Sequence, residues 1–250
     1  PYGDGSLTKP AGLQLGIVKL TEKADNMLSK LGSIVAYDTV PFTKTGLGTE
    51  TLNRGFIHLA WKSSILYYLT GKKEYAKLTA DILWNFVRGA SQQLQLNPDW
   101  EELHKKVCMN GYLSFETLGD TRHFSTIPLA YDMIYDYLQQ EYFDSEQFVK
   151  GIEGEMWAPP HPEGKKWALG CFETMFKRLI ENKLTRGGGL IGNWNMNEQQ
   201  SAMLYALALD EDSTYKDGKG RAFYVNKLVY GPTTPSHGAY LDVLRANISP

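Results

Sequence analysis

The sequence predicts an all-α fold, and two observations support this prediction. Apolar residues recur three and four positions apart in one segment after another along the 250 residues, a spacing that places them on one face of a helix. The alternation of apolar and polar residues that marks a half-buried strand is nearly absent. Because successive helical segments are joined by short connections, we expect stacked antiparallel hairpins, arranged as a solenoid or closed into an (α/α) toroid.

The expected helices follow one another along the chain. Segments 49–69 and 73–94 are separated by little more than Gly71, so they should form an antiparallel pair. Ser125 or Thr126 can cap a later helix that has Pro128 in its first turn. The remaining helices are expected at 17–36, 125–138, 165–184, 194–209, 221–230 and 238–246.

Three connections are expected to be irregular. Glycines and prolines punctuate 38–48 and 151–164, and three consecutive glycines at 187–189 should interrupt the helical pattern. The stretch 97–120 is less regular, and 112–115 could form a short strand within it. A long connection in a compact chain is more often functional than idle.

Composition excludes several classes of function. Lys and Arg total 26 against 28 Asp and Glu, so the net charge of −2 argues against a polybasic binder of nucleic acid or membrane surfaces. No apolar run approaches the roughly 20 residues that span a bilayer. Cys108 and Cys171 are expected to be unpaired buried thiols. No metal-ligand spacing, phosphate-binding loop or dinucleotide fingerprint is present, so we expect no metal and no cofactor.

The best candidate site is the start of the helix that follows the three glycines. Asn193, Asn197 and Gln200 are spaced i, i+4 and i+7, so they share one face of its first two turns. A helix N-terminus has free amide donors and a positive dipole end, which favour an anion. Trp194 beside these donors suits stacking on a sugar ring. The alternative is that Asn193 is a helix cap and the other amides are solvated.

A second candidate is the pair Arg122 and His123, expected in a loop just before a helix cap. Arg122 offers bidentate geometry for a carboxylate or sulfate, and His123 can exchange protons near neutral pH. The alternative is a surface arginine and a structural histidine. Arg54 and His58 lie four apart on a helix, and we expect them to hydrogen-bond to a neighbouring helix rather than to line a cleft.

Three stretches resemble a known family. Tyr68–Ala76 resembles the hairpin between toroid helices of heparinase II/III-like polysaccharide lyases, and Leu129–Asp136 resembles a later helix of the same toroid. Gly192-Asn193-Trp194, with the helix ending at Leu209, resembles the asparagine-bearing helix start of that family. The resemblance covers roughly 50–250.

The resemblance implies metal-independent β-elimination on uronic-acid polysaccharides. Asn193 matches the residue that neutralises the uronate carboxylate, and a Tyr or His removes the C5 proton, for which His123 and Tyr240 are the candidates. The remaining expected contacts to an acidic polysaccharide or oligosaccharide are Trp194, Asn197, Arg122, Tyr112 and Gln200.

The chain also departs from the family pattern. Trp194 stands where some relatives have His, and the family's tyrosine is expected close to or beyond Pro250. The catalytic His of relatives often comes from a following β-rich domain. The resemblance therefore implies a single, incomplete (α/α) toroid over 1–250, the N-terminal part of a longer periplasmic or secreted lyase with a possible C-terminal β-rich domain.

Two other functions remain open. A glycoside hydrolase on the same toroid needs two carboxylates facing each other across a cleft, for which Asp120, Glu116 and Glu198 are available. A non-catalytic glycan-binding helical scaffold needs no such pair.

Overall fold

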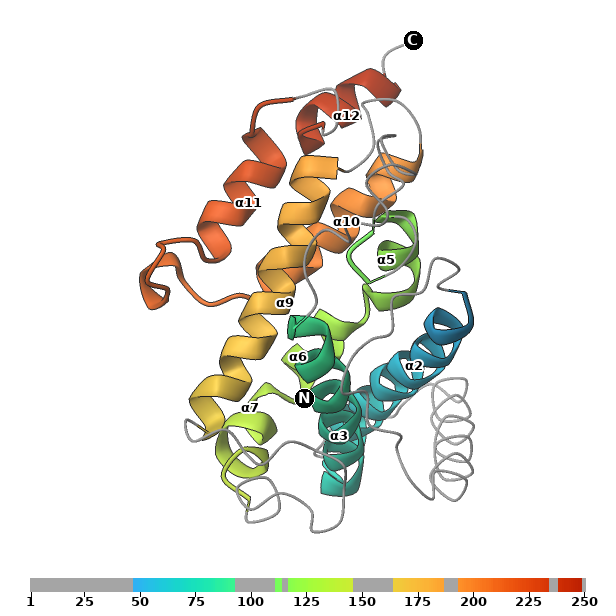
Figure 1. The fold of residues 1–250 in the computed structure, drawn as a ribbon, viewed down its shortest axis with the longest axis vertical. Coiled ribbons are helices and arrows are strands. Elements are labelled where there is room, and N and C mark those ends of the chain that lie inside the picture. Colours follow the sequence, from blue (N-terminus) through green and yellow to red (C-terminus); the bar gives the residue numbers. More distant parts are fainter. Residues whose placement is uncertain are drawn as a thin grey trace, which may run out of the picture.

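The structure, a computed structural model, describes residues 47–92, 111–113, 117–145, 164–186, 193–233 and 238–248. Within these ranges the chain forms helices and turns and no strand, so the all-α prediction is confirmed (Figure 1). No helix in the described part of the chain is both long and apolar enough to cross a membrane. The α-helices are α2 (Leu47–Thr70), α3 (Lys73–Gln92), α5 (Thr117–Phe124), α6 (Ile127–Met133), α7 (Tyr135–Tyr137), α9 (Gly164–Arg186), α10 (Asn193–Leu207), α11 (Arg221–Tyr230) and α12 (Tyr240–Ile248), with a π-helix η1 (Leu138–Tyr142) and a 3₁₀ turn η2 (Asp212–Thr214).

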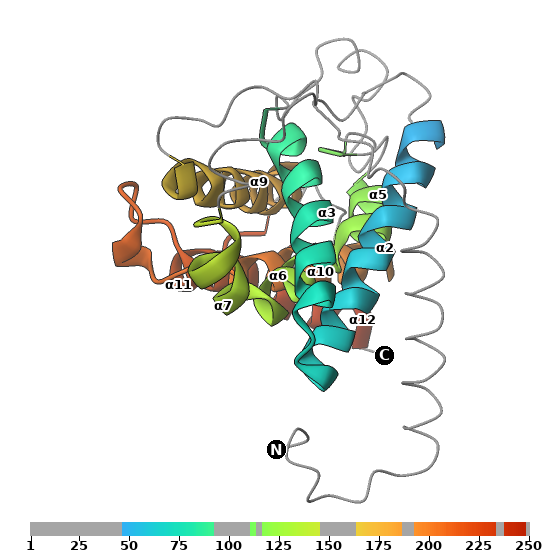
Figure 2. The same ribbon diagram turned by 90° about the horizontal axis from the view of Figure 1, so that it is seen from below.

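Helices α2 and α3 form the predicted antiparallel hairpin and lie side by side (Figure 2). Gly71 has a φ of +69°, which permits the tight turn between them. Two buried hydroxyls then join the helices: Ser63 donates to the carbonyl of Tyr75 at 2.9 Å, and Thr79 donates to that of Ala60 at 3.2 Å. Because these pairs run in opposite directions along the sequence, the helices are antiparallel.

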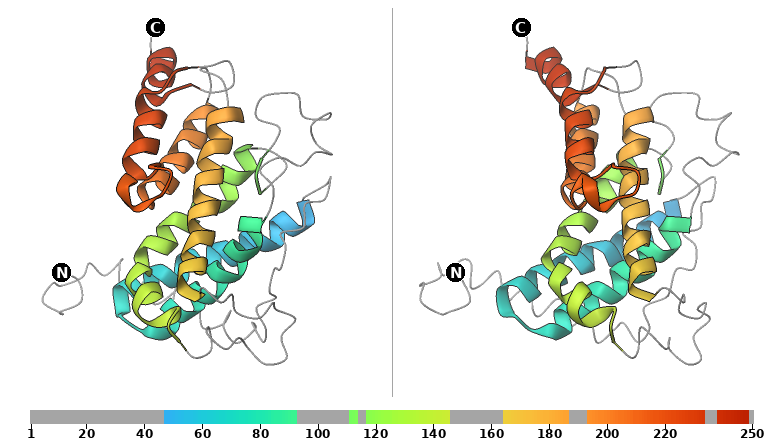
Figure 3. Two further views of the ribbon diagram at one scale, coloured as in Figure 1. Left: turned by 60° about the vertical axis from the view of Figure 1, so that its left-hand side comes forward. Right: turned by 90° about the vertical axis from the view of Figure 1, so that its left-hand side faces the viewer.

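The core centres on α9, which runs through the middle of the molecule (Figure 1) and packs against α3, α5 and α10. Aromatic side chains of α9 pack against rings of α6 and α10. Tyr131 of α6 lies 4.8 Å from Phe172 of α9, measured between ring centroids, and Phe176 lies 5.2 Å from Tyr205 of α10. Helices α11 and α12 pack on α10 at the end of the molecule away from the α2–α3 hairpin (Figure 3).

The helix predicted at 125–138 is broken, although its buried face is as expected. Ile127, Ala130, Ile134 and Leu138 are all buried, and Pro128 lies in the first turn. At Ile134 the backbone leaves the helical region (φ −113°, ψ 12°), which separates α6 from α7. Thr126 is the N-cap residue of α6, as one of the two predicted alternatives, but its hydroxyl makes no capping bond.

The loop predicted before that helix is wrong, because 120–124 belong to α5. Asp120 accepts hydrogen bonds from the backbone N–H groups of Tyr112 (2.5 Å) and Leu113 (2.8 Å), which ties the preceding segment to the helix. Phe124 is fully buried and stacks on Phe86 of α3 at 5.2 Å. These tertiary contacts stabilise a helix that the local sequence does not favour.

Other predictions lie partly or wholly outside the described residues. Residues 111–113 form no strand, and 114–116 are not described. The expected helix at 17–36, the loop at 151–164, the three glycines at 187–189, and Cys108 are also outside the described ranges. Cys171 is a buried free thiol, as predicted.

A test of packing concerns Gly220, which precedes α11. A Cβ at this position would lie 2.6 Å from the carbonyl oxygen of Asp210 and 2.7 Å from the backbone nitrogen of Asp212. We expect Gly220→Ala to lower the free energy of unfolding by about 1–3 kcal/mol, because the turn must move to accept the methyl group. Urea denaturation measures the change.

Gly55→Ala is the matched control, since a Cβ there meets nothing within 4 Å on an exposed part of α2. It should be neutral or stabilise the protein by up to about 1 kcal/mol. Equal unfolding free energies for the two variants would contradict the close packing of the turn.

Candidate functional site

The start of α10 presents the predicted polar face. Asn193, Asn197 and Gln200 are all exposed. The opposite face is buried, as predicted, through Ala202, Tyr205 and Leu209. The amides at this helix N-terminus are therefore accessible to a ligand.

Buried polar side chains anchor the same turns from the inside, a role that no local sequence pattern indicated. Lys183 of α9 donates to Oδ1 of Asn195 at 3.0 Å and lies 3.8 Å from a carboxylate oxygen of Glu198. The side chains of Lys183 and Glu198 are only 5% and 2% exposed. We call Lys183, Asn195 and Glu198 the α9–α10 polar cluster. It fixes the first turns of α10 on α9 and so holds Asn193 and Asn197 outward.

Another buried amide connects α10 to α12. The Nε2 group of Gln199 donates to the carbonyl oxygen of Gly238, and Ala239 next to it is buried. Tyr240 begins α12 directly after this contact and is half-buried. The structure thus brings the segment that carries Tyr240 against the first half of α10.

Helix α5 carries the second candidate pair and packs against both α10 and α2. Arg122 is exposed and His123 is half-buried. Burial lowers the pKa of His123, and the charges of Arg54, His58 and Arg122 lower it further. The structure therefore brings the two α5 residues close to two side chains of α2.

The α2 side chains form one basic row. Arg54, His58 and Lys62 are spaced i, i+4 and i+8, and burial together with the charges of Lys62 and Arg54 lowers the pKa of His58. Arg54 and His58 are exposed, so the expectation that they serve a neighbouring helix is wrong. The cations Arg54, Lys62 and Arg122, together with the histidines His58 and His123, make a surface that we call the α2–α5 cationic cluster.

The two aromatic candidates differ from expectation. Trp194 is half-buried, and its indole N–H is buried without a hydrogen-bond partner in the described structure. Tyr112 is only 1% exposed, and its hydroxyl donates to the carbonyl of Ala90. Burial raises the pKa of Tyr112 to about 12. The prediction that Tyr112 lines a sugar cleft is therefore wrong, because its ring is part of the core.

Two of the cavities lined by described residues include none of Asn193, Arg122, His123 and Tyr240. The smaller, of about 20 Å³, is lined by Asp120, Lys183 and Glu198 among others. It has room for about one water molecule, not for a sugar.

Asp120 and Glu198 are both buried, so their arrangement does not favour the hydrolase alternative. Glu116 lies outside the described residues.

Comparison of the chain with models of known protein families found no match, and comparison with curated proteins found none either.

The α9–α10 polar cluster can be tested through stability. Lys183→Met removes a buried ammonium that donates to Asn195 and lies beside the Glu198 carboxylate, so we expect the free energy of unfolding to fall by about 3–5 kcal/mol. Thermal or urea unfolding measures it. Lys72→Met is the control, because Lys72 is exposed, and its change should stay within about 0.5 kcal/mol. A Lys183 variant as stable as the control would disprove the anchoring role.

The cationic cluster can be tested by histidine titration. Arg54→Gln removes a charge that lowers the pKa of both histidines, so both values should rise toward the ordinary 6.5. Two-dimensional NMR of the imidazole protons follows this. Arg245→Gln on α12 serves as control and should leave both unchanged. If the pKa values of both histidines are unchanged in Arg54→Gln, the cluster does not exist in solution.

The same shifts predict how stability depends on pH. Because folding holds the pKa of His58 and His123 below 6.5, the unfolded chain binds more protons in acid. Their contribution to stability is therefore complete well above pH 6.5 and is lost as the pH falls from 6.5 through the lower pKa values of the folded state. In urea denaturation, the double variant His58→Gln/His123→Gln should show a weaker loss of stability between neutral pH and mild acid than the original protein does. An unchanged dependence would contradict these shifts.

Proposed function

We propose that the protein is a polysaccharide lyase that cleaves uronic-acid glycans by metal-independent β-elimination, its helices forming part of an (α/α) toroid. One observation carries this proposal: α10, which begins with exposed amides, packs against α5, and α5 contributes Arg122 and His123 to the α2–α5 cationic cluster. The resemblance at Gly192-Asn193-Trp194 points to the same helix start. The antiparallel α2–α3 hairpin is the repeating unit that a toroid requires.

The reaction removes the C5 proton of a uronate, and the residues at the start of α10 can make that proton more acidic. The C5 proton of a uronate becomes removable when its carboxylate is neutralised and the developing enediolate charge is stabilised. Asn193 offers a neutral amide at a helix N-terminus, where the dipole favours negative charge. Arg122, exposed on the neighbouring helix, offers a guanidinium for an acidic group of the same glycan.

The proton must also be taken up, and two residues are candidates. The lowered pKa of His123 keeps its imidazole neutral at pH 7, the form that accepts a proton. Tyr240 is half-buried on the segment held against α10 by Gln199. The other of the two, or a group from outside the described residues, would assist departure of the C4 oxygen.

The decisive variant is Asn193→Ala in the full-length protein. Loss of a group that stabilises the developing charge should lower kcat by about 100-fold or more. The increase in ultraviolet absorbance from unsaturated uronate ends measures turnover on heparan, chondroitin, hyaluronan, alginate and glucuronan. Asn226→Ala, an exposed asparagine on α11, should leave the rate unchanged.

Two results would reject the proposal. One is the absence of unsaturated products from every one of these polymers. The other is equal turnover by the Asn193 and Asn226 variants, which would leave a non-catalytic glycan-binding scaffold as the better account.

A further inference from the structure

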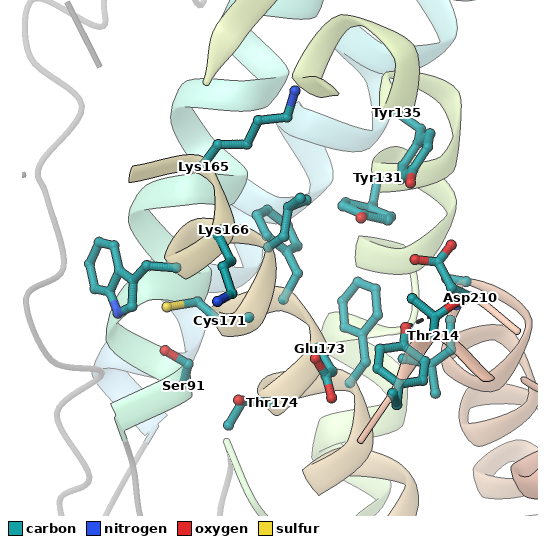
Figure 4. Close-up of a pocket in the computed structure, with 18 of the residues that line it drawn as sticks. Ser91, Tyr131, Tyr135, Lys165, Lys166, Cys171, Glu173, Thr174, Asp210 and Thr214 are labelled. Atoms are coloured by element: carbon teal, nitrogen blue, oxygen red, sulfur yellow. Dashed lines mark hydrogen bonds between the residues drawn. The ribbon is translucent and has the colours of Figure 1, made fainter. Parts of the chain in front are cut away.

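A second, larger cavity lies away from the start of α10. Its volume is about 930 Å³, and it opens between α9, the α6–α7–η1 segment and the connection from α10 to α11 (Figure 4). Leu209 and Asp210, just after α10 ends, line it. Since α10 has 15 residues, its two ends are about 20 Å apart, and the cavity lies at the end opposite Asn193.

Aromatic side chains form much of the cavity wall. Tyr131 and Tyr135 pack edge to face with ring centroids 5.5 Å apart, and Phe172 and Phe176 from α9 continue the surface. Tyr215 contributes from the α10–α11 connection, and its ring is held by the Lys177 ammonium, 4.0 Å from the ring centroid. Phe172 and Phe176 are almost fully buried and back the wall, so the half-buried Tyr135 and Tyr215 are the rings with most surface open to a ligand.

Two polar groups in the cavity have no side-chain partner in the described part of the chain. Tyr131 is only 8% exposed, yet its hydroxyl makes no described hydrogen bond. The Asp210 carboxylate makes neither a described hydrogen bond nor an ion pair, and Figure 4 shows it on the same side of the cavity as Tyr131 and Tyr135. Burial raises the pKa of these two tyrosines and of Tyr215, and the charge of Asp210 raises it further.

Asp210 is also held rigidly. Its backbone N–H donates to the hydroxyl oxygen of Tyr215 at 2.9 Å, and its carbonyl accepts from the backbone N–H of Arg221 at 2.9 Å. Gly220 packs against the same turn so closely that a Cβ would not fit. These bonds fix the backbone of Asp210, which places its exposed carboxylate beside the tyrosines.

We propose that this cavity binds a neutral pyranose oligosaccharide. The C–H faces of sugar rings pack on aromatic rings, while a carboxylate and phenols exchange hydrogen bonds with ring hydroxyls. The charged residues of the lining are two cations, Lys165 and Lys166, and two acids, Glu173 and Asp210. Because these charges balance, the lining favours a neutral ligand over a strongly acidic one. A small organic cation would fill little of a cavity of about 930 Å³. The site is separate from the proposed β-elimination site and does not depend on it.

Titration of the full chain with cellotriose, xylotriose and triacetylchitotriose tests the proposal, followed by calorimetry and by ligand-observed NMR. We expect saturable binding of at least one of them. Asp210→Asn and Tyr135→Leu should each weaken it about tenfold or more, through loss of a charge-assisted hydrogen bond or of a stacking face. Tyr131→Phe, which keeps the ring, should weaken it less than Tyr135→Leu. Circular dichroism confirms that each variant is folded.

Two controls separate this site from the start of α10. Glu211→Gln changes the next residue on the same turn, an exposed acid that does not line the cavity, and should leave binding unchanged. Asn193→Ala should also leave it unchanged, whether or not the protein proves to be a lyase. The proposal is overturned if no neutral trisaccharide binds, if Asp210→Asn binds as well as the original protein, or if Asn193→Ala abolishes binding. It is also overturned if tetramethylammonium saturates the cavity while the trisaccharides do not.

Discussion

The contact between the buried Lys183 ammonium and the α10 side chains Asn195 and Glu198 is the constraint on which the account depends. A lysine buried to this degree is costly unless oxygens surround it, and here an amide oxygen lies at 3.0 Å and a carboxylate oxygen at 3.8 Å. Because both partners lie in the first two turns of α10, satisfying the lysine fixes the rotation of that helix. The other side-chain amides of those two turns therefore point away from α9.

The polar residues at the start of α10 therefore form two groups with different roles. Asn195, Glu198 and Gln199 are buried and hold the helix to α9 and to the segment before α12. Asn193, Asn197 and Gln200 are exposed and available to a ligand. Positive charge from Arg54, Lys62 and Arg122 lies on the surface of α2 and α5 and lowers the pKa of the histidines there. An acidic ligand is the natural complement of such a surface.

Much of this fold could be predicted from the sequence, because the relevant signals are local. The i, i+3, i+4 pattern located most of the long helices, and the bounds of α11 were predicted without error. The turn at Gly71 required only a residue that tolerates positive φ. Helix α5 could not be predicted, because the bonds from Asp120 to the Tyr112 and Leu113 amides depend on the tertiary fold. The same is true of the lysine buried twelve residues before Asn195, and of the meeting of Arg54 and His58 with His123.

The most direct measurement is an NMR titration of the protein with a saturated hexuronate trisaccharide, observing the side-chain amides and imidazoles. We expect the amide signals of Asn193 and Asn197 and the imidazole signal of His123 to shift together along one saturation curve, with an affinity that falls as salt is added. The signal of Asn226 should stay in place. Shifts confined to other regions, or shifts of Asn193 and His123 with different affinities, would contradict the claim that α10 and α5 form one acidic-sugar site.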